Sequence, residues 1–187
     1  MNKALIVYGS NYGATAGTSQ EIAAVMRKEG LDVHVVDAKK EKISGLSEYD
    51  LVLVGSGIEI GKWHKEIEAF LKNFQKDLVS KKLALFVSCG ASSIALNDGK
   101  PEEMAKNKEA YLDKEAAKFG LTPVAYGFFG GIYDYNKMSL FVKLILRRSI
   151  TPKLKSAFKE SPPGVYDTRN MDEVKNWATE LVKNIRK

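Results

Sequence analysis

Residues 4–15 read Ala-Leu-Ile-Val-Tyr-Gly-Ser-Asn-Tyr-Gly-Ala-Thr, an apolar run followed by a loop rich in hydroxyl groups. The run at 4–8 is continuous rather than alternating, which predicts a strand covered on both faces. A helical pattern follows the loop, with Ile22, Val25 and Met26 on one side. A strand that leads through a short loop into a helix is typical of the first half of a βαβ unit.

The same alternation continues along the chain. Further apolar runs predict strands at 33–36, 51–54, 83–87 and 124–129. Helical patterns lie between these runs, the clearest being an amphipathic stripe over 67–78. We therefore expect an α/β fold, a three-layer sandwich with helices on both faces of a five-stranded parallel sheet. The strand order 2-1-3-4-5 is one of the two common solutions for such sheets.

The length of 187 residues suits one domain, so we expect a single domain over 1–187. Asn170 and Glu173 predict a capping box at the start of a C-terminal helix. Before it, at about 149–170, we expect an irregular segment, because it contains Pro152, Pro162, Pro163 and Gly164.

The loop after the first strand has the chemistry of a phosphate site. It supplies the hydroxyls of Ser10, Tyr12 and Thr15 next to a helix start, where unpaired N–H groups and the helix dipole favour an anion. Gly13 permits the left-handed backbone that such a loop needs. No G-x-x-x-x-G-K-[ST] pattern occurs, which excludes a nucleoside triphosphatase loop. A plain strand–helix turn with capping hydroxyls is the alternative interpretation.

The pattern Ser10-x-Tyr12-Gly13-x-Thr15 resembles the FMN-phosphate loop of the flavodoxin family. The stretches 54–58 and 128–135, together with Trp63 and His64, are similar to one branch of that family, which includes the menaquinone-dependent protoporphyrinogen oxidases. The resemblance covers nearly the whole chain. It implies a flavodoxin-like fold and one bound FMN, with the flavin at the carboxyl ends of the strands.

The resemblance also implies which loops contact the cofactor. The expected cofactor-binding residues follow strands 1, 3, 4 and 5: Ser10, Asn11, Tyr12, Gly13, Ala14, Thr15, Ser56, Gly57, Ile58, Glu59, Ile60, Gly61, Trp63, Ser88, Cys89, Gly90, Gly130, Gly131 and Asp134. Trp63 either stacks on the flavin or packs against the following helix. Cys89 either tunes the flavin or is a small buried apolar residue. His64 is interpreted as structural, and we expect no catalytic residue.

Residues 138–149 predict an unusually apolar helix that is flanked by basic residues. Three interpretations stay open: a core helix, the face of a homodimer, or a surface that docks on a membrane containing quinones. No apolar run approaches the ~20 residues needed to span a bilayer. We expect no tight association with membranes.

Composition and net charge limit the classes of binding partner that we expect. The net charge of +6 is compatible with a solvated basic surface, an acidic redox protein partner or an anionic membrane face. Scattered lysines without a recognition module argue against nucleic acid. One cysteine and two distant histidines predict no metal site, and a strand pattern that starts at residue 4 predicts no signal peptide. These features favour a cytoplasmic protein.

Two main functions follow from the resemblance. The first is a low-potential flavodoxin that shuttles single electrons between redox enzymes. The alternative is an enzyme, a menaquinone-dependent protoporphyrinogen oxidase or a related FMN quinone oxidoreductase; a nitroreductase is a third. The absence of an evident acid–base pair in the sequence favours the carrier.

Overall fold

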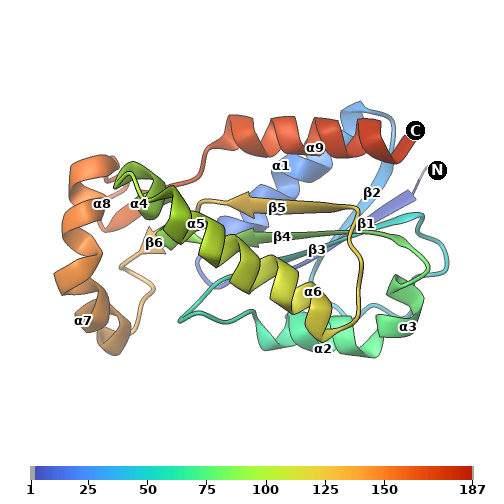
Figure 1. Ribbon diagram of the computed structural model, residues 1–187, viewed down its shortest axis with the longest axis horizontal. Helices are drawn as coiled ribbons and strands as arrows, with labels where there is room; N and C mark the ends of the chain where they lie inside the picture. Colours follow the sequence, from blue (N-terminus) through green and yellow to red (C-terminus); the bar gives the residue numbers. More distant parts are fainter. Residues whose placement is uncertain (1–2, 187) are drawn as a thin grey trace.

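The computed structural model describes residues 3–186 and is built on a parallel sheet of five strands (Figure 1). Its order is β2-β1-β3-β4-β5, which confirms the predicted fold class and strand order. The strands are β1 (Lys3–Gly9), β2 (Asp32–Asp37), β3 (Leu51–Gly57), β4 (Lys82–Ser88) and β5 (Ala125–Phe129).

Helices cover both faces of the sheet (Figure 1). One face is covered by α1 (Ala14–Lys28) and α9 (Met171–Arg186), which pack on each other. The other face is covered by α2 (Lys65–Asn73), α3 (Gln75–Leu78), the π-helix η1 (Glu109–Asp113) and α6 (Lys114–Lys118). Between β4 and η1 lie α4 (Gly90–Asn97) and α5 (Pro101–Lys108).

The continuous apolar character of the strands has a direct cause in this arrangement. Successive side chains of a strand point to opposite faces, so a strand between two helix layers needs apolar residues at every position. In β1, Leu5 and Val7 pack with the layer of α2, whereas Ala4 and Ile6 pack with α1 and α9. All four are at most 1% exposed. Full burial of each large apolar side chain contributes about 1.5–3 kcal/mol.

Two helix predictions need refinement. The stripe at 67–78 forms two helices, α2 and α3, because the backbone leaves helical geometry at Phe74, which has φ −105° and ψ 14°. At the C-terminal helix, the amide oxygen of Asn170 accepts hydrogen bonds from the N–H groups of Asp172 and Glu173, at 3.1 and 3.2 Å. This is the Asn170 half of the predicted capping box.

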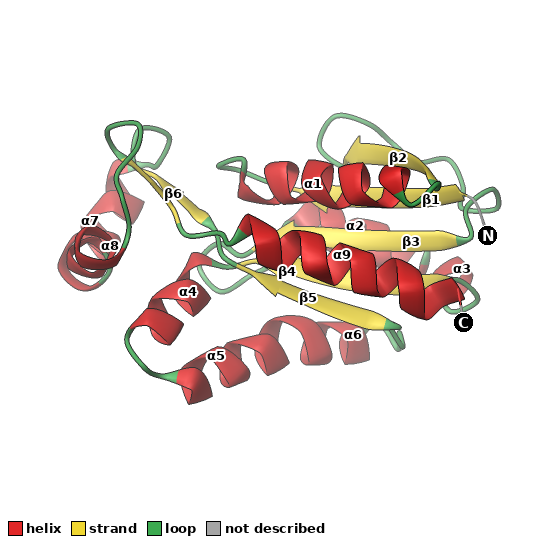
Figure 2. Ribbon diagram, turned by 90° about the horizontal axis from the view of Figure 1, so that it is seen from above, coloured by secondary structure: helices red, strands yellow, loops and turns green. Residues whose placement is uncertain are grey.

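A small extension stands beyond the carboxyl ends of the strands, apart from the sheet (Figures 1 and 2). It consists of β6 (Ile132–Asp134), α7 (Leu140–Ser149), α8 (Thr151–Ala157) and β7 (Val165–Asp167), with β6 and β7 antiparallel. The expectation of an irregular segment at about 149–170 was therefore wrong for α8 and β7. Pro152 lies in the first turn of α8, where proline is compatible with a helix.

Candidate functional site

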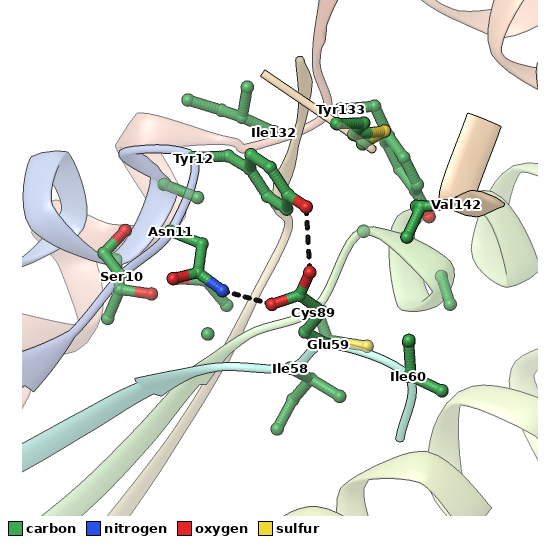
Figure 3. Close-up of a pocket in the computed structure, with 18 of the residues that line it drawn as sticks. Ser10, Asn11, Tyr12, Ile58, Glu59, Ile60, Cys89, Ile132, Tyr133 and Val142 are labelled. Atoms are coloured by element: carbon green, nitrogen blue, oxygen red, sulfur yellow. Dashed lines mark hydrogen bonds between the residues drawn. The ribbon is translucent and has the colours of Figure 1, made fainter. Parts of the chain in front are cut away.

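A cavity of about 280 Å³ lies where the carboxyl ends of β1, β3 and β4 face the extension (Figure 3). Its walls come from the loops after these strands, from β6 and from α7. Fourteen of the expected cofactor-binding residues line it: Ser10, Asn11, Tyr12, Ala14, Thr15, Gly57, Ile58, Glu59, Ile60, Gly61, Ser88, Cys89, Gly90 and Gly131. Five others lie outside its wall: Gly13, Ser56, Trp63, Gly130 and Asp134.

The loop after β1 has the geometry of an anion site. Gly13 is left-handed, with φ 88°, and its N–H donates to the Ser10 hydroxyl oxygen at 3.1 Å. Helix α1 begins at the next residue. The Thr15 hydroxyl is fully buried and has no hydrogen-bond partner within residues 3–186. Because an unpaired buried hydroxyl is costly, Thr15 is set to bind a ligand atom.

Glu59 joins this loop to the turn after β3. The Tyr12 phenol donates to Glu59 Oε1 at 2.8 Å, and the Asn11 side-chain amide donates to Glu59 Oε2 (Figure 3). Burial, followed by the hydrogen bond to Glu59, raises the pKa of Tyr12 to about 12. The phenol therefore stays protonated, and the carboxylate places a negative charge in the cavity wall.

Lys39, which lies in the loop after β2, approaches the same site and was not predicted. Its ammonium group donates to Asn11 Oδ1 and lies 3.4 Å from the carbonyl oxygen of Ser10. The loop itself contains no cation, as its sequence indicates, but this lysine supplies a positive charge beside it. No local motif points to Lys39; only the parallel pairing of β2 with β1 brings it there.

The turn after β3 is tight. Glu59 and Lys62 exchange two backbone hydrogen bonds of 3.1 Å across Ile60 and Gly61, which have φ 48° and 74°. Positive φ is unfavourable for a β-branched residue, so Ile60 is held in a strained conformation at the cavity edge. Two positive φ values in a two-residue turn define a type I′ geometry.

Trp63 and His64, beside this turn, have structural contacts. The buried Trp63 indole donates to the Tyr111 carbonyl oxygen at 2.7 Å and packs in the core, so the packing interpretation describes its position. The His64 ring lines the cavity, and its backbone N–H donates to the Ser56 hydroxyl at 2.9 Å. Burial, and next the charge of Lys39, lowers the pKa of His64.

The segment after β4 forms a flat wall. Among the described residues, the buried Ser88 hydroxyl has no hydrogen-bond partner, and Ser88 lines the cavity. A Cβ atom on Gly90 would lie 2.3 Å from the Tyr133 ring, and one on Gly131 would lie 2.7 Å from the Gly90 nitrogen. Only glycine therefore fits at these two positions. The buried Cys89 lines the cavity beside them, and burial raises the pKa of its thiol.

Gly130 and Asp134, after β5, support the wall from behind. A Cβ atom on Gly130 would lie 2.2 Å from the carbonyl oxygen of Thr168, so this position is closely packed. Burial alone would raise the pKa of Asp134, but hydrogen bonds from Lys137 and from the N–H of Asn136 hold it below its usual value. Asp134 is ion-paired with Lys137 at 2.9 Å.

Part of the cavity wall was not predicted. These residues are His64, Ala91, Tyr111, Ile132, Tyr133, Met138, Val142, Ile145, Leu146 and Ile150. The sequence did indicate part of this wall, because the apolar residues Val142, Leu146 and Ile150 recur every four positions, as expected for one side of a helix. None of the residues of α7 is buried, so the core-helix interpretation was wrong.

The fold and this site define a class: open parallel α/β proteins with an anion loop after the first strand and a flat cavity beyond the sheet. A family model described as a flavodoxin domain matches residues 5–157, and the chain belongs to the flavodoxin family. As a member of this family, the protein is an FMN flavoprotein.

Known proteins of two kinds are similar to the chain. Protoporphyrinogen IX dehydrogenase (quinone) of Escherichia coli strain K12 is 22% identical over 151 residues, which are 79% of this chain and 80% of that protein. Oxidised Flavodoxin 1 from Bacillus cereus superposes with a TM-score of 0.57 at 16% identity, covering 97% of this chain and 98% of the other. A flavodoxin from the domain Archaea gives 0.52 at 18% identity, covering 99% of both. At these identities the two solved structures show the fold alone.

The residues present fit FMN. The Thr15 hydroxyl, which has no hydrogen-bond partner among residues 3–186, lies beside the start of α1 and suits a phosphate. Gly90 and Gly131 line the same cavity and have no side chain to obstruct a planar ring. Residues 3–186 contain no cluster of three side chains that would hold a metal ion, and none of their helices is long and apolar enough to cross a membrane.

Proposed function

We propose that the protein is an FMN-dependent electron-transfer protein that passes single electrons between redox partners in the cytoplasm. The observation that carries this proposal is the buried, unpartnered hydroxyl of Thr15, which sits in the cavity wall one residue into α1. FMN, when bound, accepts and releases one or two electrons. The chain contributes the binding, the orientation and the electrostatics.

The proposed phosphate site is formed by Ser10, Thr15 and the free N–H groups at the start of α1. The left-handed conformation of Gly13 turns the backbone toward that position. Lys39 adds a positive charge on the outer side of the loop, through its hydrogen bond to Asn11. Together these groups anchor the cofactor by its charged end.

The ring of the cofactor would lie against the flat wall formed by Gly90 and Gly131, with the turn at Gly57–Gly61 over its edge. Space at Gly57 is limited, because a Cβ atom there would lie 3.2 Å from the Thr15 hydroxyl oxygen. The buried hydroxyl of Ser88, which lines the cavity and has no hydrogen-bond partner among the described residues, is a free donor on that side.

The negative charge of Glu59 supports transfer of single electrons, because it repels negative charge that is added in the cavity. At an effective dielectric of ~20, a carboxylate about 6 Å from an added negative charge costs roughly 3 kcal/mol, on the order of 0.1 V for one electron. The mostly apolar walls of the cavity weaken the solvation of added charge as well. Uptake of a proton with the first electron would leave the charge of the flavin unchanged, so Glu59 would oppose mainly the second reduction and separate it from the first.

A second function is favoured by one specific observation. Val142, Leu146 and Ile150 lay an apolar wall over the cavity, which suits an apolar substrate. The Escherichia coli relative is named for protoporphyrinogen IX and quinone. The second candidate is therefore an FMN oxidoreductase of porphyrinogens or quinones.

An assay of electron donors and acceptors distinguishes the two proposed functions. The carrier predicts that the reduced, FMN-loaded protein reduces cytochrome c in single steps and that protoporphyrinogen with menaquinone gives no protein-dependent porphyrin fluorescence. Rapid porphyrin formation at catalytic protein concentrations would replace the carrier with the oxidoreductase. Variants with Val142→Ser or Leu146→Ser should then lose turnover while retaining bound FMN.

A further inference from the structure

Helix α7 has two apolar faces. Val142 and Leu146 line the cavity, whereas Leu140, Phe141 and Leu144 point away from it and are 84%, 67% and 68% exposed. At 3.6 residues per turn, these three form one side of the helix. Single exposed apolar residues are ordinary, but this is a contiguous group on one surface.

The positive charge of the protein is concentrated around this face. Residues 135–159 contain seven lysines and arginines and no aspartate or glutamate, so they carry a charge of +7. Two of the seven, Lys137 and Lys153, are paired with Asp134 and Asp98. The whole chain carries +6, which leaves −1 for all other residues together. Within the described residues, Lys143, Arg147 and Arg148 of α7 make no ion pair. Their charge is available to a partner outside the molecule.

A second copy of this chain is a poor match for that surface. A symmetric dimer places the same patch on both sides of the interface, so basic residues of both copies would be brought together with no acid from residues 135–159 among them. Such like-charge contacts are costly when they are desolvated. An anionic lipid surface suits both features of this face. It accommodates the exposed apolar side chains, and it attracts lysine and arginine.

We propose that the outward face of α7 docks the protein peripherally on membranes that contain anionic lipids. Leu140, Phe141 and Leu144 insert at the level of the headgroups, and Lys143, Arg147 and Arg148 contact the lipid phosphates. The same helix forms one wall of the cavity, so docking places that wall at the membrane surface. Apolar redox molecules dissolved in the bilayer would then lie next to it. This proposal is independent of whether the flavin carries single electrons.

The test uses the full-length, FMN-loaded protein. Its partition is measured by co-sedimentation with vesicles of phosphatidylcholine plus phosphatidylglycerol, and with phosphatidylcholine alone. We expect binding to the anionic vesicles that high salt reverses, since surface charge is screened within about 10 Å at ~0.1 M salt. The double variant Arg147→Gln/Arg148→Gln should weaken partition about 25-fold, roughly fivefold for each charge.

Three further variants separate the contribution of the apolar face from general effects of charge. Leu144→Glu, on the outward face and not in the cavity wall, should abolish binding to anionic vesicles. Val79→Glu is the matched control, because Val79 is 67% exposed on another part of the molecule, after α3. Lys106→Gln/Lys108→Gln on α5 is the control for charge. Both controls should bind like the wild type, and all variants should keep the flavin spectrum of the folded protein.

Three outcomes would overturn the proposal. The first is no sedimentation with anionic vesicles. The second is equal weakening by the Val79→Glu or the lysine controls, which would indicate a nonspecific charge effect. The third is a lipid-free dimer in analytical ultracentrifugation that Leu144→Glu dissociates, because a second copy would then cover the face.

Discussion

The phenol of Tyr12 donates to the Glu59 carboxylate at 2.8 Å and so joins the loop after β1 to the turn after β3. The two residues are 47 positions apart in the chain, and they meet because β1 and β3 are neighbours in the sheet. This contact places the negative charge of Glu59 in the cavity wall. The neighbouring loop after β1, in contrast, has the geometry of an anion site. In the proposed function, the charge of Glu59 separates the two flavin reductions.

Replacing Glu59 by glutamine removes the charge and retains an oxygen that accepts from Tyr12. We expect the potential of the second reduction to rise by on the order of 0.1 V, because the repulsion at Glu59 is lost. Spectroelectrochemistry of the FMN-loaded protein measures this shift. Glu102→Gln, in the first turn of α5, is the control and should leave the potential unchanged. An unchanged potential in Glu59→Gln would mean that this carboxylate does not tune the flavin.

Thr15→Ala should weaken FMN binding roughly 10- to 150-fold, the effect of losing one charge-assisted hydrogen bond of about 1.5–3 kcal/mol. Thr18→Ala is a closely matched control. Its hydroxyl is also buried and unpartnered, but it does not line the cavity. Affinities come from quenching of FMN fluorescence. If both variants bind FMN like the wild type, the phosphate site lies elsewhere.

Gly13→Val tests the left-handed turn before α1. Valine resists a φ of 88°, so the loop should lose its shape and FMN should bind at least as weakly as to Thr15→Ala. Gly30→Val is the control, since Gly30 has φ 83° and lies far along the chain from the cavity. Both variants should lose stability in urea unfolding, but only Gly13→Val should lose FMN affinity. A loss of affinity of equal size in Gly30→Val would show that general destabilisation is the cause.

The local motifs were predictable from the sequence, whereas contacts made across the fold were not. Ser10–Thr15 form a motif within six residues, and the strand that precedes them is a continuous apolar run, so both signals are local. Lys39 reaches the same loop from the end of β2, and Tyr111 reaches the cavity from a π-helix; no pattern near either residue reports the cavity.

Helix α7 shows what the spacing of apolar residues does not predict, namely which side of a helix faces the protein. The spacing of Val142, Leu146 and Ile150 indicates one apolar side, and Leu140 and Leu144 indicate another, so the pattern cannot say which side faces the protein. The prolines at 152, 162 and 163 suggested an irregular segment, but a proline in the first turn is compatible with α8. Tertiary contacts of Leu154 with Ile94 and Tyr166 then stabilise this segment.

The rate at which Cys89 is alkylated should depend on pH. Burial raises the pKa of the thiol above its ordinary value of 9.0, so less thiolate is present at a given pH than in a free cysteine. The rate of reaction with iodoacetamide should therefore rise with pH around a midpoint above 9.0, and FMN should slow it, because Cys89 lines the cavity. A midpoint below 9.0, or no protection by FMN, would contradict the assigned environment.

The central claim, that the protein holds FMN as a carrier of single electrons, is tested most directly by anaerobic photoreduction of the FMN-loaded protein. With Glu59 opposing the second reduction, the account predicts that a flavin reduced by one electron accumulates and is then reduced further in a separate phase. Its long-wavelength absorbance should reach a maximum midway through the titration and be smaller in Glu59→Gln. Direct conversion from oxidised to fully reduced flavin, with no such absorbance at any stage, would contradict the account.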